Sequence, residues 1–590
     1  MNYLDEQISF KAVDKKIIIR LRDKVCETSK ELIGSLLFRD VLRRYVKSLE
    51  NKNSPLCQIF NKKTEIDDSD IQALIDTFQV LENMPLENVP KLVKNSERFI
   101  EEKFLLYDFV EKFYDFWRSF ERFLVCDSEG ERLDKRPFRT FNSTIEELTH
   151  LIRKTYRDIE ENITGRHPAV YRQVAAGAEV ALIALPKQLD MPLLYRKHLE
   201  QIAVIRQILL YPPLLLNPPM NKRTGRFVRI DENPLNRVEL ERGEWLCYPA
   251  KVGTLFILVY FHEKFYELGL ALCNLFEIAE DDILKRRPDA VYLFGLPGTS
   301  LDDLAELPTV FYDDEENGML IGAVPGRDEF GYFGYLKKMI LTLHNIKILK
   351  MGKMPYHGAM VKIMLKGDKS ANILLIGDTG AGKSESLEAF RNLAGGLIKD
   401  ITIIADDMGS LEIDAQGRII GYGTEIGAFV RLDDLQPGFA FGQLDRTIIM
   451  NPAQINARVV LPVTTFENVI KGFPLDMVLY ANNYEMVDGE HPIIDRLPNP
   501  ETALHIFREG TAMSKGTTTS TGLVHTYFVN IFGAVQYRDL HEKIAERYFK
   551  VFYDAGLFVG QLRTRLGISG WEMRGPEEAA KALLAFIQER

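Results

Sequence analysis

A chain of 590 residues, 46% hydrophobic and 27% charged, is too long for one core and has the composition of an ordinary globular protein with two or three domains. Its net charge of −10 argues against a surface that recruits nucleic acid or anionic membranes. Five dispersed cysteines without a C-x-x-C pair, an amino terminus without a signal-peptide core, and the lack of any apolar run long enough to cross a bilayer predict a cytoplasmic protein with reduced thiols.

The first part of the chain, residues 1–215, is expected to form a mainly helical domain. The stretch "EEKFLLYDFVEKFYDFWRSFERFLV", 101–125, places apolar residues at intervals of three and four, which predicts an amphipathic helix packed on its own core. Two proline pairs, Pro212-Pro213 and Pro218-Pro219, predict a domain boundary nearby. Such a domain is a candidate for regulation, for binding a protein partner or for self-association.

Residues 216–330 are expected to form a smaller mixed α/β subdomain, because short β-like runs such as "RFVRI", "TLFILVYF", "AVYLFG" and "GMLIGAVPG" alternate with turn residues. From 331 to 590 strands and helices alternate, which predicts an α/β domain. Its expected elements include the strand "NILLIG", a helix from Lys383 to about Asn392, the strand "DITIIA", a hairpin at Gln416-Gly417 and a final helix in "PEEAAKALLAFIQER".

The most informative motif is "LLIGDTGAGKSESLEAF", residues 374–390. From Gly377 to Ser384 it follows the pattern G-x-x-x-x-G-K-[ST] between a strand and a helix, which predicts a loop that cradles the phosphates of a nucleotide. In such a loop Lys383 contacts the terminal phosphate and Ser384 holds a divalent cation. The predicted nucleotide-binding residues are Gly377, Asp378, Thr379, Gly380, Ala381, Gly382, Lys383 and Ser384.

Further candidates flank this loop. Asp406 and Asp407 end a predicted strand downstream of it, which favours an Mg²⁺ or Mn²⁺ site, although one of the two carboxylates can instead act as a base. Upstream, Lys337 and Lys338 precede an isolated histidine, His357. Each of these residues alone also fits an ordinary structural role: a helix-capping aspartate, an exposed lysine or a buried histidine.

In combination these motifs resemble the ATP-dependent phosphoenolpyruvate carboxykinases over about residues 330–535. "YFGYLKK", an interval of nineteen positions from Lys338 to His357, the phosphate loop and "ADD" follow the order of that family's metal site. The resemblance implies Lys338, His357 and Asp407 as Mn²⁺ ligands, and Ser384 as a ligand of the nucleotide's metal. It also implies a carboxykinase fold with a mixed sheet.

The same resemblance extends to several residues on either side. "YGTEIGAFVR" places Glu425 in register with the family's Asn-Phe-Glu-Gly-Gly run, and Arg458 resembles the arginine that bridges transferred phosphate and substrate. Tyr332 and Arg226, the latter in "RTGRF", are the implied substrate contacts. The segment 510–534 resembles part of the family's nucleotide pocket, although the position of its adenine-packing arginine falls on Thr519.

The phosphate loop itself, "GDTGAGKSE", and "HGAMVKI" also resemble HPr kinase/phosphorylase, in which an aspartate is the base for a serine hydroxyl. Asp378 and Ser384 depart from the carboxykinase pattern, where the loop ends in Lys-Thr and has no acidic second residue. Three functions are therefore carried forward. They are a carboxykinase that converts oxaloacetate and ATP (or another nucleotide or pyrophosphate) to phosphoenolpyruvate with Mg²⁺ and Mn²⁺, a kinase for a hydroxyl compound or protein, and a non-catalytic ATP sensor.

Overall fold

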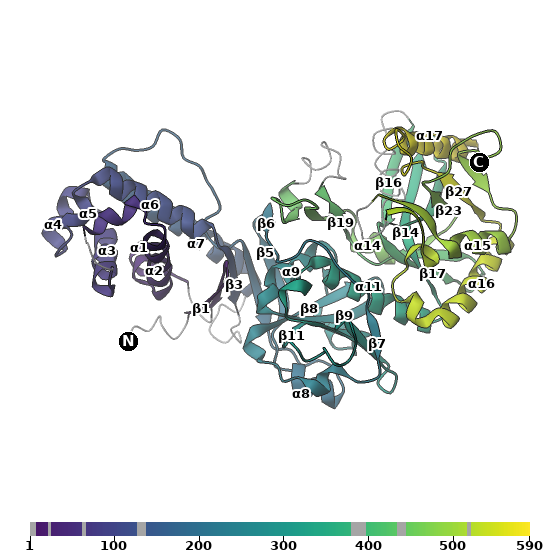
Figure 1. The fold of residues 1–590 in the computed structure, drawn as a ribbon, viewed down its shortest axis with the longest axis horizontal. Coiled ribbons are helices and arrows are strands. Elements are labelled where there is room, and N and C mark those ends of the chain that lie inside the picture. Colours follow the sequence, from purple (N-terminus) through teal and green to yellow (C-terminus); the bar gives the residue numbers. More distant parts are fainter. Residues whose placement is uncertain are drawn as a thin grey trace. The chain divides into compact units, whose positions relative to one another are not determined.

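The computed structural model describes residues 8–21, 25–61, 66–126, 137–378, 397–432, 444–515 and 521–589 of the chain. The protein is mixed α/β and divides into two compact units. The first comprises Met1–Pro186 with Ala203–Leu214, and the second comprises Lys187–Ile202 with Leu215–Arg590 (Figure 1). No helix in the described ranges is both long and apolar enough to cross a membrane.

The first unit contains a sheet as well as helices, and this sheet was not part of the expectation of a mainly helical domain. Its strands run in the order β1 (Ile8–Val13), β2 (Lys16–Leu21), β3 (Glu121–Cys126), β4 (Val180–Leu185) and β5 (Val204–Leu210). The pairs β2–β3 and β3–β4 are parallel, and the outer pairs are antiparallel. Its helices include α1 (Ser29–Gly34), α2 (Leu36–Asn51), α3 (Asp68–Leu81), α6 (Lys103–Arg118) and α7 (Pro137–Thr164).

The aromatic stretch 101–125 is split between a helix and a strand. Its helical part, α6, buries Leu106, Phe109 and Val110 in a core shared with the other helices. The chain then turns at Ser119 and enters β3, whose residues after Glu121 are all buried. A helical spacing of apolar residues continues across this turn by chance, which is why the sequence predicted one uninterrupted helix.

The second unit begins with a mixed sheet that confirms the β-like runs predicted in 216–330. The strands lie in the order β8 (Trp245–Val252), β9 (Leu255–His262), β11 (Ala290–Leu296), β13 (Met319–Pro325), β12 (Val310–Asp314) and β7 (Val228–Ile230), with β10 (Glu277–Ile278) paired to β8. The long helix α11 (Phe333–Lys350) packs on β11 and β13 and is buried along almost its whole length.

A second sheet in this unit holds the predicted nucleotide-binding region. Its order is β22 (Phe473–Pro474), β18 (Ile419–Gly423), β17 (Met408–Ile413), β14 (Met354–Leu365), β15 (Ser370–Ile376), β23 (Met477–Asn482), β27 (Phe558–Arg563) and β24 (Ile494–Arg496), with β16 (Ile398–Ala405) also paired to β14. The strands β15, β23 and β27 are parallel, and β17–β18 is the hairpin expected at Gln416-Gly417.

Helices cover both faces of this second sheet. On one face, α15 (Pro500–Glu509) and α16 (Arg538–Asp554) bury aromatic residues against alternate strand positions such as Tyr356 and Met360. On the other face, α17 (Arg574–Glu589) contacts β24 and β27 (Figure 1). Its buried side chains belong to the same core as Val361 and Ile363 of β14. The alternation of buried side chains along β14 therefore builds a layered α/β domain. The predicted helix from Lys383 to Asn392 lies outside the described residues.

Two small sheets and several short helices complete the unit. β21 (Arg458–Pro462) pairs with β19 (Gly427–Arg431) and β20 (Ile448–Met450), and β25 (Thr511–Lys515) forms a hairpin with β26 (Thr521–His525). Short helices in the described ranges include α4 (Val89–Leu92), α5 (Glu97–Ile100), α8 (Leu193–Leu199), α9 (Tyr266–Leu270), α10 (Asp281–Leu284) and α14 (Phe466–Ile470).

Candidate active site

The amino-terminal turn of α11 carries the paired lysines into the second unit's interior. Tyr332 caps the helix without a side-chain hydrogen bond, and its ring lies against Gly334, where a Cβ atom would come within 2.2 Å of the ring. Glycine at this position therefore lets Tyr332 fold back over the helix start. Lys337 follows one turn later with only 2% of its surface exposed.

His357 reaches the same region from strand β14. Its carbonyl oxygen accepts a hydrogen bond from the Gly377 N–H, at the start of the predicted phosphate loop. The next residue, Gly358, donates its N–H to the Asp407 carbonyl and lies so close to β15 that a Cβ would be 2.6 Å from the Leu375 oxygen. Glycine at position 358 is thus required by the close approach of β14 and β15.

The Asp407 carboxylate joins these elements. Its Oδ1 atom lies 3.0 Å from His357 Nε2, and its Oδ2 atom lies 3.0 Å from Lys337 Nζ. Lys337 also pairs with the Glu425 carboxylate at 3.1 Å, and Glu425 is only 1% exposed. One buried ammonium group therefore bridges two carboxylates.

Burial and charge shift the pKa values of these groups in opposite directions. Burial alone would lower the pKa of Lys337, but the carboxylates of Asp407, Glu425 and Asp406 outweigh it and raise the pKa above its usual value. Burial raises the pKa of Glu425 to about 8, against the lowering effect of Lys337. Near neutral pH the pair therefore consists of a charged lysine and a largely protonated glutamic acid.

Lys338, the neighbouring residue, behaves differently. Burial and the nearby Arg223 guanidinium lower the pKa of Lys338 to about 8, although Asp407 and Asp378 act against this. Its ammonium group lies 5.0 Å from the centre of the Phe532 ring, and the His357 ring lies 5.8 Å from the same ring. Lys338 can therefore present a neutral amine beside His357 at mildly alkaline pH.

The hydrogen bonds of His357 indicate whether Lys338, His357 and Asp407 together could hold a cation. Its Nδ1 atom lies 2.6 Å from the carbonyl oxygen of Val529, which can only accept, so Nδ1 carries the proton. The other ring nitrogen, Nε2, faces a carboxylate oxygen 3.0 Å away. A divalent transition metal between these two atoms would satisfy both, with the Lys338 amine as a third donor. Lys338, His357 and Asp407 therefore fit such a metal.

This set differs from the usual protein metal sites. Within the described ranges, no three His, Cys, Asp or Glu side chains gather into a metal-binding group. The candidate set contains only two residues of these types, and the third is an amine. Its use as a ligand requires the lowered pKa of Lys338.

Two arginines flank Tyr332 in this region. Arg458, on β21, acts electrostatically on the Tyr332 side chain, and its guanidinium lies 5.5 Å from the Phe429 ring. Arg223 acts electrostatically on Tyr332 and Lys338, and lies 5.1 Å from the Phe227 ring. Among the residues that the structure describes, neither arginine has a carboxylate within ion-pairing distance. Both charges are thus available to an anion.

Arg223 is the residue that sequence reasoning missed. The resemblance pointed to Arg226 in "RTGRF", but the Arg226 side chain is exposed, whereas Arg223 is half-buried. The chain turns between them at Gly225, with φ of +79°, and the Tyr335 hydroxyl bonds to both backbone groups of Thr224. The sequence does not indicate which of the two arginines in this short motif faces inward. The turn at Gly225 determines that it is Arg223.

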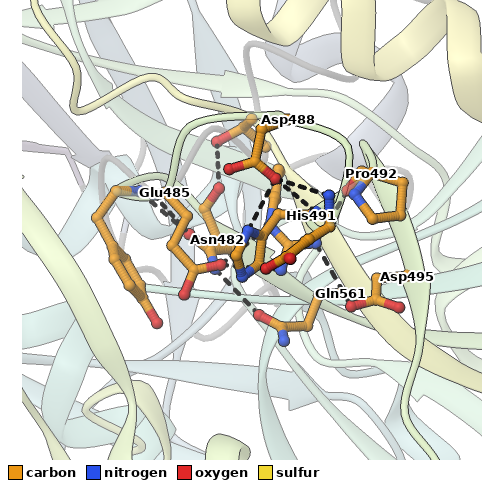
Figure 2. A network of polar contacts seen from close by, with 11 residues as sticks. Asn482, Glu485, Asp488, His491, Pro492, Asp495 and Gln561 are labelled. Atoms are coloured by element: carbon orange, nitrogen blue, oxygen red, sulfur yellow. Dashed lines mark hydrogen bonds and ion pairs between the residues drawn. The ribbon is translucent and has the colours of Figure 1, made fainter.

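The carboxyl ends of the parallel strands are held by a second polar network, shown in Figure 2. Arg563, at the end of β27, is 2% exposed and binds the Glu485 carboxylate at 2.9 Å and the Pro492 carbonyl at 2.9 Å. At the end of β23, Asn482 donates to Gln561 and accepts the backbone N–H of Glu485. The loop after β23 is thereby fixed at the edge where β15 enters the predicted phosphate loop.

The hairpin β25–β26 is attached to this same edge. Asn483 pairs with both backbone groups of Met513, with its oxygen accepting at 2.8 Å and its nitrogen donating at 2.9 Å. The Tyr480 hydroxyl donates to the Thr511 carbonyl. This hairpin belongs to the segment 510–534 that the resemblance assigned to the nucleotide pocket, and Thr519 lies outside the described residues.

The predicted site residues divide into three groups. In the first group, Lys338, His357 and Asp407 lie together, and Tyr332 and Arg458 lie beside them. Asp406 belongs to the same group, because its charge helps to raise the pKa of Lys337. Gly377 follows β15, and Asp378 lies 3.9 Å from His357. Residues Thr379, Gly380, Ala381, Gly382, Lys383 and Ser384 lie outside the described residues.

Comparison with known proteins adds no assignment to this geometry. No family model matches the chain, and no curated protein matches it.

Proposed function

We propose that the protein is a nucleotide- and metal-dependent phosphoryl-transfer enzyme of the phosphoenolpyruvate carboxykinase type. The observation that carries this proposal is the group formed by Lys338, His357 and Asp407, in which a histidine lone pair, a carboxylate and an amine of lowered pKa meet. It lies where β14 contacts the start of the predicted phosphate loop. ATP, or another nucleotide or pyrophosphate, is the proposed phosphoryl donor.

In the proposed reaction oxaloacetate loses CO₂, and the enolate oxygen that remains attacks the γ-phosphorus of ATP with release of ADP. A Mn²⁺ ion at this group would supply charge stabilisation for the developing enolate oxygen, and an Mg²⁺ ion would accompany the nucleotide. Arg458 and Arg223 would hold the anionic groups of substrate and phosphate. Lys337, which keeps its proton, would neutralise Asp407 and contact Glu425, and so preserve the geometry of the group.

A kinase of the HPr kinase type is the second candidate, because Asp407 is also well placed to act as a base. His357 and Lys337 fix its carboxylate from two sides, and a hydroxyl acceptor has to be deprotonated before it attacks a phosphorus atom. In this reaction the acceptor loses its proton to Asp407, whereas the carboxykinase reaction needs no such transfer.

A coupled assay tests the proposal. Purified full-length protein with Mn²⁺, Mg²⁺ and ATP should form phosphoenolpyruvate from oxaloacetate, and Lys383→Ala should abolish this turnover. Absence of phosphoenolpyruvate together with ATP-dependent phosphorylation of a hydroxyl compound or a protein would replace the carboxykinase by the kinase. Lack of both reactions alongside ATP binding would indicate a sensor.

A further inference from the structure

The carbonyl that accepts the His357 Nδ1 proton belongs to an unusual backbone segment. Residues Phe528, Val529 and Asn530 all have positive φ, at 43°, 52° and 63°. Asparagine tolerates this left-handed conformation, but a bulky aromatic and a β-branched residue adopt it rarely and with strain. The three residues follow one another at the end of η10 (Tyr527–Val529), so the strain is concentrated in one turn.

The surroundings of this turn hold it in place. Phe528, Val529 and Ile531 are buried in the core between the second sheet and its helices. The Phe528 ring packs edge-on against His541 at 4.6 Å, and the Tyr527 hydroxyl lies 2.8 Å from His541 Nδ1. Burial of these apolar side chains thus offsets the backbone strain.

A glycine sets the position of the turn from outside. Gly510, which ends α15 with φ of +56°, accepts the Thr526 N–H through its carbonyl. A Cβ atom at this position would lie 1.9 Å from the Thr526 oxygen and 2.6 Å from the Val529 nitrogen. Any larger residue therefore has to displace the turn and, with it, the Val529 carbonyl.

We propose that the left-handed turn at Phe528–Asn530 is a positioning device that fixes the ring orientation of His357. The Val529 carbonyl accepts the Nδ1–H hydrogen bond, which directs Nε2 at Asp407 and at the cation of the proposed function. The inference depends on the proposed function for what the ring is positioned to do. The hydrogen bond itself is a property of the metal-free protein and can be measured separately.

Downstream of the turn, the same segment positions the second ligand. Asn345, fully buried in α11, donates its side-chain N–H to the Phe532 carbonyl at 3.0 Å, and the Phe532 ring lies beside both Lys338 and His357. A displacement of the turn is therefore expected to disturb two of the three proposed ligands together.

The test uses two pairs of variants of the full-length chain. Asn530→Val places a β-branched residue in the left-handed region, and Asn530→Gly, its matched control, relaxes the same position; the Asn530 side chain is exposed, so neither creates a cavity. Gly510→Ala displaces the turn directly. Gly556→Ala is its control, because Gly556 also has positive φ, at 74°, but a Cβ there contacts nothing within 4 Å.

The first readout is the Nδ1–H···O=C hydrogen bond of His357 in metal-free, ¹⁵N-histidine-labelled protein, seen as a slowly exchanging downfield Nδ1–H signal and assigned by its loss in His357→Gln. The second is the Kd for Mn²⁺ alone, measured by electron paramagnetic resonance. We expect the Nδ1–H signal in the wild type and both controls. Asn530→Val and Gly510→Ala should lose this signal and show roughly 10- to 100-fold weaker Mn²⁺ binding, the range found for lost outer-shell partners.

An unchanged Nδ1–H signal in folded Asn530→Val and Gly510→Ala would overturn the inference, as would an equal loss in Asn530→Gly. If Mn²⁺ binding to the wild type does not depend on His357, the metal site of the proposed function is overturned instead. In that case the hydrogen-bond measurement still decides whether the turn positions the ring.

Discussion

At the scale of single residues, Arg223 links the charge of the site to its pH dependence. A lysine must lose its proton before it binds a metal, so Mn²⁺ affinity should increase as the pH rises through about 8, where Lys338 titrates. Arg223 lowers the pKa of Lys338, so in Arg223→Gln the increase in Mn²⁺ affinity should occur at higher pH. The variant should also have a higher KM for an anionic substrate, because a positive charge is lost. Mn²⁺ titrations between about pH 6.5 and 9 measure the first effect, since metal binding requires the free amine.

Arg226→Gln is the matched control, because Arg226 lies three residues away in the same motif and is exposed. Its Mn²⁺ titration and its KM should remain those of the wild type. If Arg226→Gln and Arg223→Gln change these quantities equally, the assignment of the inward-facing arginine is wrong.

Glu425 should make the second unit less stable as the pH rises. In the folded protein the pKa of Glu425 is raised to about 8, above the value of about 4.3 for an unfolded chain. Between these two pKa values the folded state binds more protons than the unfolded state. The stability that Glu425 contributes is therefore fully present below the unfolded pKa and is lost as the pH rises through the folded pKa. The slope cannot exceed about 1.4 kcal/mol per pH unit.

Glu425→Gln keeps the shape of the side chain and removes its titration. In metal-free protein its free energy of unfolding, measured with guanidinium at several pH values from about 5 to 9, should therefore vary less than that of the wild type. An equally steep loss of stability in this variant would mean that the slope comes from other groups.

At the scale of elements, Arg563 ties the ends of β23, β24 and β27 together. It is buried and pairs with Glu485 while also binding the Pro492 carbonyl, and Asp495 on β24 lies 3.6 Å from it (Figure 2). Arg563→Ala leaves the Pro492 carbonyl and Glu485 without this partner. Breaking a buried pair costs about 3–5 kcal/mol, and the partial exposure of Glu485 places the expected loss at the lower end.

Chemical denaturation measures this loss, and Arg418→Ala is a suitable comparison. Arg418 pairs with Asp414 at 2.8 Å on an exposed hairpin, so its removal should cost less than about 1 kcal/mol. Equal losses in the two variants would show that Arg563 contributes no more than a surface ion pair.

The elements that the sequence predicted correctly are those with continuous apolar runs. β11 and β13 are buried along their whole lengths and β9 along all but its last residue, so their composition alone identifies them. The sheet of the first unit was missed because its strands are brief and are separated by long helices whose periodicity dominates. For the site, local motifs located Lys338, His357 and Asp407, whereas the inward position of Arg223 depends on a turn that only tertiary contacts define.

The strained turn at Phe528–Asn530 was also beyond sequence reasoning. Phe and Val rarely adopt positive φ, so their presence argued against the conformation that the structure shows. Local preference and tertiary packing conflict here, and such conflicts are concentrated at functional sites.

At the scale of the whole molecule, the two units have separate hydrophobic cores and should unfold in separate transitions. The first unit's cores contain residues such as Leu42 and Phe78 from its helices and Leu124 from its sheet. The second unit's cores contain Tyr356 and Phe549 on one face of the sheet and Ile363 on the other. Calorimetry of the full chain should therefore resolve two transitions.

A ligand and a variant should each move one of these transitions alone. Mn²⁺ with ATP at about 100 times its Kd should stabilise the second unit by about 2.7 kcal/mol and leave the other transition in place, because all of the proposed site residues belong to the second unit.

Glu160→Gln should act only on the first unit. There, burial and Glu111 raise the pKa of Glu160, so wild-type stability falls as the pH rises towards that pKa, and a neutral glutamine removes this loss. Calorimetry at about pH 8 should thus show Glu160→Gln raising one Tm and the ligand raising the other. A single transition that both changes shift would show that the two units unfold together, and that the first unit responds to occupancy of the site in the second.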